Sequence, residues 1–243
     1  MSVKQKVLVS RPRSQCHQLA EGVFALGAEP LVMPSIDIIK LTIPPENMTG
    51  ATAIVTSANA AHSAMENGFI FDDVKLLAVG AATTRSFTQK GYTVRWTAEP
   101  ANSEGVVEIL RSAEDCQDTP FFLLTGVGGR NLIQDYLVQS DLQFRRLDLY
   151  RRQDYPFDRG ELDRLSSFNG LVTVGSNESL SSFHRQLGTR FSGFAENPLV
   201  VNSERGRQHA LSLGWQGDIY VPMTPGDTGQ LACIGQWLTK FEV

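Results

Sequence analysis

The sequence predicts an α/β protein built of two doubly wound parallel-sheet domains. Short apolar runs alternate along the chain with stretches of helical periodicity, which is the pattern of parallel strands joined by helices. An internal repeat indicates two related domains, and the order of its copies places one domain inside the other. The chain has 243 residues, 42% of them hydrophobic, which is enough for two cores of this kind.

Ten apolar runs are predicted as strands, and helices are expected between them. Three of the expected helices, 16–24, 82–90 and 204–213, are followed by Gly27, Gly91 and Gly214, where a left-handed C-terminal cap belongs. The strands are expected at 7–10, 30–33, 53–56, 76–79, 93–96, 121–124, 144–150, 171–174, 198–201 and 218–221.

The repeat sets the domain organisation. The segment 7–33 resembles 121–147, the segment 54–68 resembles 172–188, and a weaker likeness joins 78–91 to 200–214. The chain is therefore expected to begin one five-stranded domain with two strands, insert a second five-stranded domain, and then complete the first with three strands.

These units give domain boundaries. We expect a discontinuous domain formed by 1–35 and 157–243, an inserted domain at 50–145, and a two-stranded linker at 36–49 and 146–156. Prolines in or beside the linker favour the extended backbone that it requires, and they are Pro34, Pro44, Pro45 and Pro156.

Composition excludes several classes of protein. The formal net charge is -4 and no Lys- or Arg-rich run occurs, which argues against nucleic-acid binding. No stretch has the apolar length of a membrane span or a signal segment, so a soluble cytoplasmic protein is expected. No metal site is expected either, because the cysteines and histidines lack ligand spacing; they are Cys16, Cys116, Cys233, His17, His62, His184 and His209.

An ordered set of short motifs identifies a family. The motifs are V-L-V-S-R-P-R (7–13), T-S-A-N-A (56–60), A-V-G-A-A-T (78–83), S-E-G (103–105), G-V-G-G-R-N-L (126–132) and L-Y-R-R (149–152). None of them is specific alone. Taken in order, together with the interrupted repeat, they make nearly the whole chain resemble the uroporphyrinogen-III synthase family.

The resemblance implies an activity in tetrapyrrole and heme biosynthesis. Such an enzyme is a cofactor-free, monomeric hydro-lyase that cyclises hydroxymethylbilane to uroporphyrinogen III, with loss of water and inversion of ring D. The substrate is expected in a cleft between the two α/β domains. In one loop the chain departs from the family pattern, because Ser203 and Gly206 stand where a Gly and a Thr are expected.

Small polar residues follow the predicted strands, where parallel sheets bind ligands. Hydroxyls and backbone N–H groups at helix starts can hold the carboxylates of such a substrate. The expected substrate-binding residues are Arg11, Arg13, Thr56, Ser57, Gly80, Thr83, Ser103, Arg130, Ser176 and Asn177.

Each of these positions has a simpler interpretation. Ser57, Ser103 and Ser176 can be ordinary helix N-caps, and the arginines can be solvated surface charges. Arg130 stands at the start of a predicted helix, where a positive charge is unfavourable, and this favours an anionic partner. Thr83 occupies a position that the family pattern keeps as threonine.

Tyr150 is the expected catalytic residue, because it matches the tyrosine that the family pattern places at the second crossing between the domains. A phenol keeps its proton at neutral pH, so the resemblance implies that Tyr150 donates a hydrogen bond or a proton to the departing hydroxyl. The alternative is an aromatic ring that only packs the linker.

Two other functions fit parts of the sequence. Gly126, Gly128 and Gly129 follow a strand and precede a helix, with Asp148 further on, as in a dinucleotide site, although the third glycine of that fingerprint is Asn131 here. A non-catalytic two-lobed binding protein fits the domain architecture. Conversion of hydroxymethylbilane separates the enzyme from both alternatives, and titration with NADH tests the dinucleotide site.

We expect conversion of hydroxymethylbilane without added metal, nucleotide or flavin. Exhaustive treatment of the purified protein with EDTA should change the rate by less than about twofold, because the sequence has no metal-ligand cluster. Loss of turnover that zinc or magnesium restores would contradict this expectation.

Overall fold

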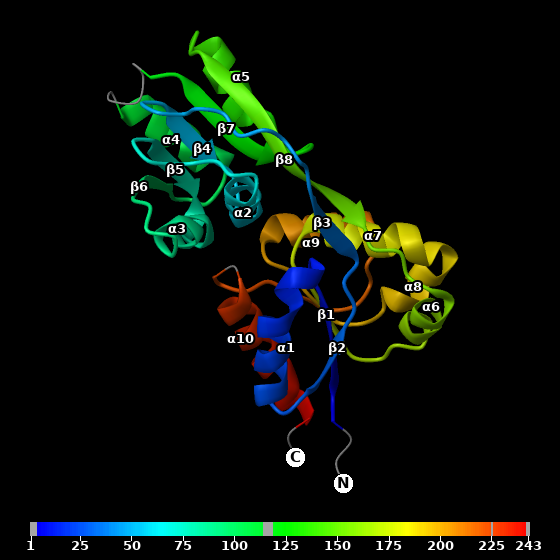
Figure 1. The fold of residues 1–243 in the computed structure, drawn as a ribbon. Helices are drawn as coiled ribbons and strands as arrows, with labels where there is room; N and C mark the ends of the chain where they lie inside the picture. Colours follow the sequence, from blue (N-terminus) through cyan, green and yellow to red (C-terminus); the bar gives the residue numbers. More distant parts are fainter. Residues whose placement is uncertain (1–3, 114–118, 225, 242–243) are drawn as a thin grey trace. The chain divides into compact units, whose positions relative to one another are not determined.

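A computed structural model describes residues 4–113, 119–224 and 226–241. The chain divides into two compact units, unit 1 (Met1–Asp37 with Gln153–Val243) and unit 2 (Ile38–Arg152). Each unit has a parallel-dominated sheet with helices on its faces, so the predicted fold class is confirmed (Figure 1).

Unit 1 is built on a five-stranded parallel sheet in the order β11-β10-β9-β1-β2. The alternation of side chains along β1 assigns the two faces. Val7 and Val9 pack with α1 and α10, and Leu8 packs with α6, α7, α8 and α9. Figure 1 shows these two helical layers on opposite sides of the sheet. The strands are β1 (Lys6–Ser10), β2 (Glu29–Val32), β9 (Leu171–Val174), β10 (Leu199–Val200) and β11 (Ile219–Tyr220).

Two helices of unit 1, α1 and α9, confirm the helices expected at 16–24 and 204–213. The helices of unit 1 are α1 (Cys16–Ala25), α6 (Arg159–Ser166), α7 (Asn177–Leu187), α8 (Phe191–Phe194), α9 (Glu204–Ser212) and α10 (Asp227–Leu238), with short 3-10 turns at Arg13–Gln15, Gly188–Arg190 and Thr239–Phe241.

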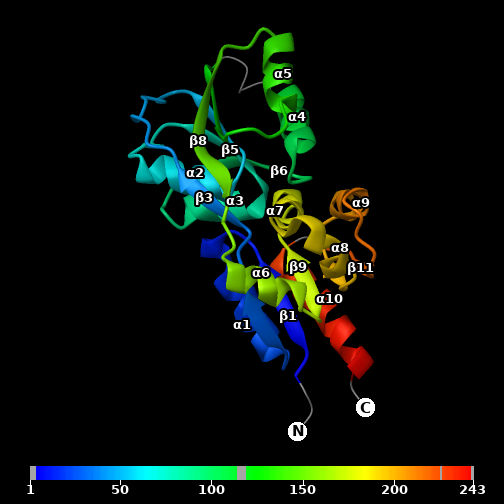
Figure 2. The ribbon, with the colours of Figure 1, turned by 90° about the vertical axis from the view of Figure 1, so that its right-hand side faces the viewer.

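Unit 2 has a six-stranded sheet in the order β3-β8-β7-β4-β5-β6. Ile54 of the central strand faces α4 and α5, whereas Ala53 and Val55 face α2 and α3. Figure 2 shows the two helix pairs on either side of the strands. The elements are β3 (Ile36–Lys40), β4 (Thr52–Val55), α2 (Ala58–Glu66), β5 (Lys75–Val79), α3 (Gly80–Thr88), β6 (Val94–Ala98), α4 (Ser103–Ser112), β7 (Phe121–Gly126), α5 (Leu132–Gln139) and β8 (Phe144–Asp154).

The sixth strand corrects the expected count of five strands in each sheet. Leu41 N–H donates to the carbonyl of Leu149, and Tyr155 N–H donates to that of Ser35, so β3 runs antiparallel to β8. The chain enters unit 2 on β3 and leaves it on β8. The sequence of β3, I-D-I-I-K, is rich in β-branched residues, which favour a strand. From the sequence, this segment is assigned to the linker and is not placed in a sheet.

The internal repeat is visible in the strand order. If each strand of unit 1 is replaced by its counterpart in the repeat, the order β11-β10-β9-β1-β2 becomes β6-β5-β4-β7-β8, which is the parallel part of unit 2. The three predicted glycine caps are also confirmed, since Gly27, Gly91 and Gly214 have φ of 84°, 87° and 87°.

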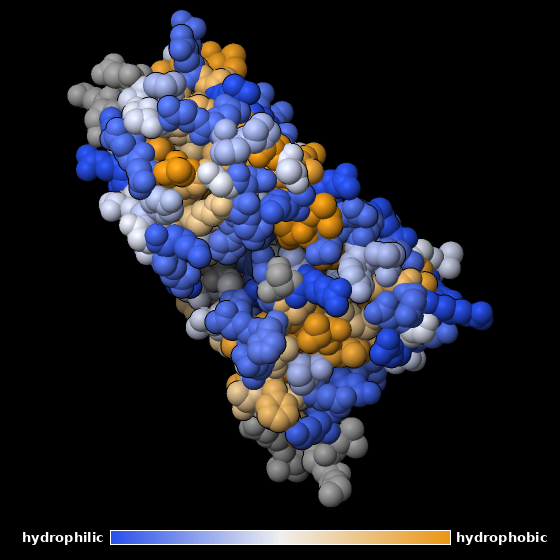
Figure 3. Space-filling view, viewed as in Figure 1, coloured by the Kyte–Doolittle hydropathy of each residue, from blue (hydrophilic) through white to orange (hydrophobic). Residues whose placement is uncertain are grey.

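The described residues contain no group of three or more His, Cys, Asp or Glu side chains that could hold a metal ion. Cys16 and Cys233 are buried free thiols, and Cys116 lies outside the described residues. No helix in the described ranges is both long enough and apolar enough to cross a bilayer. The face drawn in Figure 3 is mainly hydrophilic, with apolar patches dispersed on it.

One exposed ion pair in unit 1 joins the end of β8 to α7. Arg185 Nε lies 3.0 Å from Asp154 Oδ2, and its hydrogen bond lowers the pKa of the Asp154 carboxyl and raises that of Arg185. Because the pKa of Asp154 is lowered in the folded protein, the pair stabilises the fold above the unfolded value of about 4. The stabilisation is lost as the pH falls through the folded value.

Asp154→Asn is therefore expected to lower the free energy of unfolding at pH 7 by no more than about 1 kcal/mol, since the pair is largely solvated. The difference from the parent should disappear in acid. Urea unfolding at several pH values measures it, with Asp154→Asn/Arg185→Gln as the control, which should be no less stable than Asp154→Asn. A difference that persists in acid would contradict the ion-pair origin.

Candidate functional site

The sheet of unit 2 has a point where the chain connections diverge. From β4 the chain continues to β5 and β6 on one side, whereas β7 and β8 lie on the other side. The loops that follow β4 and β7 therefore lead away from each other and leave a crevice at the carboxyl ends of the strands, where doubly wound sheets bind ligands. A cavity of about 140 Å³ occupies this place, and its walls are Thr56, Ser57, Ser103, Leu123, Thr125, Gly126, Gly128, Gly129, Arg130, Ile133, Arg146, Tyr150 and Arg152.

Tyr150 lines this cavity and is only 2% exposed. Its partner in the neighbouring strand is Gly126, and a Cβ atom there would lie 2.6 Å from Tyr150 Cζ. Only glycine allows this approach. The phenol oxygen lies 3.1 Å from Ser57 Oγ and 3.1 Å from Arg152 Nη2, and the Arg152 guanidinium lies 5.4 Å from the centre of the ring.

Ser57 is both a helix N-cap and a residue that lines the cavity. It is the N-cap of α2, with extended backbone, and its Oγ accepts the Ala60 N–H at 3.1 Å. The same oxygen contacts the Tyr150 hydroxyl. The preceding residue, Thr56, also lines the cavity and donates to Thr125 Oγ1 at 3.0 Å, which ties the end of β4 to the end of β7.

Ser103 lines the cavity, and the alternative that it is a helix N-cap is wrong. Asn102 caps α4, because its backbone is extended and its side chain accepts the Gly105 N–H at 2.9 Å, which leaves Ser103 as the first helical residue. Arg130 forms a bidentate ion pair with Glu104, with Nη2 2.9 Å from Oε2. The electrostatic reason for expecting an external anion at Arg130 therefore disappears.

Two arginines of the cavity were missing from the expected residues. Arg146 Nε binds Asp148 Oδ1 at 3.0 Å, and its other nitrogens reach Gln134 Oε1 at 3.2 Å and the Gly128 carbonyl at 3.3 Å, so it holds the glycine loop. Arg152 binds Tyr150. The period of two along β8 could have placed Arg152 beside Tyr150, but the pairing with β7 is irregular between Asp148 and Tyr150, so the period could not have found Arg146.

The corresponding point of unit 1 lies between β1 and β9, and Arg11 occupies it. Arg11 forms an ion pair with Asp227 and donates to Gln230 Oε1 at 2.8 Å, while the Gln230 amide donates to the Val174 carbonyl and to Asn202 Oδ1, both at 2.9 Å. The Arg11 side chain is 11% exposed, and its Nε has no hydrogen-bond partner among the described residues. Arg11 is thus an internal link between α10 and the sheet.

Three other expected residues lie outside the cavity of unit 2. Arg13 is exposed in unit 1, with its guanidinium 5.8 Å from the centre of the Tyr155 ring. Thr83 is 1% exposed and donates to the Val79 carbonyl at 2.8 Å. Gly80 has a φ of 76°, and a Cβ atom there would lie 2.7 Å from that of Ala101, so backbone geometry explains the glycine.

Ser176 and Asn177 line a smaller hollow of about 80 Å³ at the carboxyl ends of β9 and β10. Ser176 caps α7 as Ser57 caps α2, and it accepts the Ser179 N–H at 3.2 Å. Ser203 caps α9 by accepting the Gly206 N–H at 3.2 Å. Both residues that depart from the family pattern therefore lie in this hollow.

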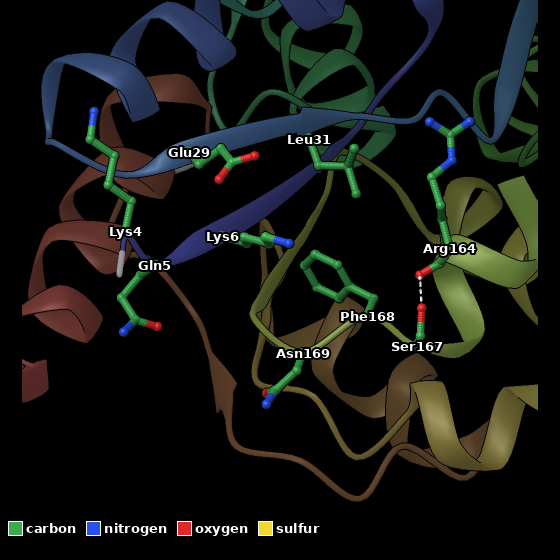
Figure 4. A pocket seen from close by; sticks show the side chains of 9 residues that line it. All are labelled: Lys4, Gln5, Lys6, Glu29, Leu31, Arg164, Ser167, Phe168 and Asn169. Carbon is green, nitrogen blue, oxygen red and sulfur yellow. Dashed lines mark hydrogen bonds between the residues drawn. The ribbon is translucent and has the colours of Figure 1, made fainter. Parts of the chain in front are cut away.

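A larger hollow in unit 1, about 560 Å³, lies at the opposite end of its sheet. It is bounded by the amino ends of β1 and β2 and by the connection from α6 to β9. Figure 4 shows Lys6, Arg164 and Phe168 around it, and none of the expected site residues is among its walls. The charged side chains there are exposed, and amino ends of parallel strands are not where such sheets bind ligands, so the cavity beside Tyr150 is the stronger candidate.

Comparison with known families decides between the interpretations of this site. The family model of uroporphyrinogen-III synthase HemD matches residues 17–229. The chain belongs to the uroporphyrinogen-III synthase family. This confirms the resemblance and the predicted function of uroporphyrinogen-III synthesis in heme and tetrapyrrole biosynthesis.

Solved uroporphyrinogen III synthases have the same fold. The enzyme from Helicobacter pylori is 12% identical, with a TM-score of 0.68 over 98% of this chain and 99% of that one. A mutant enzyme from the extremely thermophilic bacterium Thermus thermophilus is also 12% identical, with a TM-score of 0.64 over 97% and 99% of the two chains. At this identity the likeness concerns the fold alone.

The dinucleotide interpretation is not favoured for this member of the uroporphyrinogen-III synthase family. Asp148 lies within β8 and its carboxylate is bound by Arg146, whereas that interpretation needs a free acid near the end of the strand. Helix α5 begins only at Leu132, beyond the three glycines.

Gly126→Ala tests the close contact with Tyr150. The added methyl group must displace the ring, so we expect an overpacking cost of about 1–3 kcal/mol in the free energy of unfolding. Synthase activity should fall more than this loss of stability explains at a temperature where the variant is folded. Gly235→Ala is the control, because a Cβ atom on Gly235 meets nothing within 4 Å. Equal behaviour of the two variants would contradict the contact.

Proposed function

We propose that the protein is a hydro-lyase that removes the terminal hydroxyl of hydroxymethylbilane as water and closes the chain to uroporphyrinogen III, with Tyr150 as the proton donor. Membership in the uroporphyrinogen-III synthase family supports the substrate and the reaction. One observation supports the role of Tyr150: the residue lines the cavity where the sheet diverges, and its hydroxyl is within reach of Ser57 and Arg152.

Loss of the hydroxyl needs a proton, because water leaves far more readily than hydroxide. In the proposed step the Tyr150 O–H bond breaks as its proton moves to the hydroxyl oxygen of the substrate. The C–O bond then breaks, and water and an azafulvene-like cation result. The substituted carbon of ring D attacks this cation to give a spiro intermediate, which fragments and closes again with ring D inverted. The proton lost when the last ring regains its aromaticity restores the phenol.

The remaining task is conformational. The substrate also cyclises spontaneously to the uninverted isomer, so the protein must hold the chain in one geometry while water leaves. The hydroxyls of Thr56, Ser57 and Ser103 line the cavity. Ser103 can donate to a substrate carboxylate, whereas Thr56 and Ser57 must first give up their contacts with Thr125 and Tyr150. In unit 1 we propose the same role for Ser176 and Asn177, because their hollow lies at strand ends equivalent by the repeat.

The other expected contacts have weaker support. To bind a carboxylate of the substrate, Arg11 and Arg130 must first give up their ion pairs with Asp227 and Glu104. Gly80 can contribute only its backbone N–H. Thr83 has its hydroxyl bound within its own helix, and Arg13 is exposed. A cytoplasmic location and a monomeric state are further proposals that rest on the family resemblance, and analytical ultracentrifugation tests the monomer.

Tyr150→Phe tests the catalytic role. The ring is kept and the hydroxyl is lost, so we expect the rate of uroporphyrinogen III formation to fall at least roughly tenfold, with more uroporphyrinogen I from the spontaneous reaction. Tyr92, whose ring packs in the same core, gives the matched control Tyr92→Phe. The measurement is isomer-resolved chromatography, with the melting temperature of each variant. An unchanged rate and isomer ratio in Tyr150→Phe would exclude the catalytic role.

A further inference from the structure

We propose that Arg152 is a positioning residue that makes the Tyr150 hydroxyl an effective proton donor. Its guanidinium donates to the phenol oxygen, leaves the phenol hydrogen available to the cavity, and stabilises the phenolate that forms as the proton departs. This inference rests on the proposed role of Tyr150 and assigns a cause to it.

The geometry comes directly from the strand. Arg152 lies two residues beyond Tyr150 in β8, so both side chains are on the same face. Arg152 Nη2 is 3.1 Å from the phenol oxygen, and the guanidinium lies 5.4 Å from the centre of the ring. Arginine has donors only, so in this contact the phenol oxygen must accept.

Ser57 completes the arrangement. Its Oγ already accepts the Ala60 N–H, and its single hydrogen can be donated to the phenol oxygen 3.1 Å away. The phenol oxygen then accepts from Arg152 and from Ser57 together. In that state the hydrogen of the phenol has no acceptor within the network, and it is free to be donated to an oxygen of the substrate in the cavity.

Charge distinguishes Arg152 from the other arginines of the cavity. Arg130 is paired with Glu104 and Arg146 with Asp148, so each of these cations is compensated by a carboxylate. In the part of the chain that the structure describes, the hydrogen bond and the ring contact of the Arg152 guanidinium are both with Tyr150. Its positive charge is therefore available to the phenol.

The interaction is stronger in the transition state than in the ground state. As the proton moves to the substrate, the phenol oxygen becomes negative, and a neutral hydrogen-bond acceptor becomes a charged one beside a cation. Only an interaction that strengthens in this way accelerates the reaction. Preorganised donors to a developing oxyanion are typically worth about 10²–10³ in kcat, and because Arg152 is exposed we expect the lower part of that range or somewhat less.

The test compares Arg152→Gln, which removes the charge and keeps an amide donor, with Arg152→Lys, which keeps the charge. We expect Arg152→Gln to lower kcat for uroporphyrinogen III formation by about ten- to a hundredfold, with KM changed less than about threefold. Arg152→Lys should recover most of the rate. The matched control is Arg151→Gln, which removes the same charge from the opposite face of β8 and should leave both constants within about twofold of the parent.

A double-mutant cycle decides whether Arg152 acts through Tyr150. In the Tyr150→Phe background, Arg152→Gln should cause no further loss in kcat beyond about twofold, because the oxygen that it serves is absent. An equal loss in both backgrounds would overturn the inference. So would a raised KM at unchanged kcat, which would make Arg152 a binding residue for a substrate carboxylate.

The two proposals fail differently. If Tyr150→Phe is as active as the parent, the catalytic role of Tyr150 is wrong and the role of Arg152 falls with it. If Tyr150→Phe is slow and Arg152→Gln is as fast as the parent, Tyr150 remains the donor and only the positioning role is wrong. Melting temperatures of all variants confirm that each comparison is made on folded protein.

Discussion

The pairing of β7 with β8, which sets Gly126 against the ring of Tyr150, is the constraint on which the site depends. Because no side chain intervenes, the ring lies close to the backbone of β7 at Gly126, and its hydroxyl reaches Ser57 at the start of α2. The hydroxyl contacts Oγ of the N-cap Ser57, and the same oxygen accepts the Ala60 N–H of α2. The absence of a Cβ atom at Gly126 thus allows Tyr150 of β8 and the N-cap Ser57, which follows β4, to form a hydrogen bond across the point where the chain connections diverge.

The two units carry different side chains at equivalent strand ends. The residue after β1 in unit 1 is Arg11, which is bound to Asp227 and Gln230, and the repeat places Thr125 of β7 at the equivalent position of unit 2, where it accepts from Thr56. Both units keep the capping serine after the central strand, Ser57 and Ser176. Equivalent strand ends therefore carry a pair of hydroxyls in one unit and an internal ion pair in the other.

Local pattern predicted what depends on near neighbours. The alternation of Val7, Leu8 and Val9, and the glycine after α1, specify a buried strand and a helix end without any tertiary information. The place of Thr56 and Ser57 at a strand end also followed, since parallel sheets bind ligands at the carboxyl ends of their strands, whereas Tyr150 was expected from the family resemblance. The partners of the arginines did not follow, because Asp227 and Glu104 lie far along the chain from Arg11 and Arg130 and nothing local pairs them. The cap at Asn102 was missed because N-S-E-G offers two adjacent capping residues, and only the backbone conformation chooses between them.

Because unit 2 is inserted into unit 1, the two units can fold in a definite order during synthesis. Strand β1 leaves the ribosome before unit 2, yet its parallel partner β9 begins only at Leu171, after the whole of unit 2 has been synthesised. Unit 2 is continuous in sequence, so it can complete its core while the edge of β1 that later pairs with β9 is still unpaired. When the chain emerges from unit 2, it is already held beside the point where it entered, because β8 pairs with β3. Folding of unit 2 therefore brings the two halves of unit 1 close together. The entropy cost of closing the long intervening loop is then offset before β1 pairs with β9.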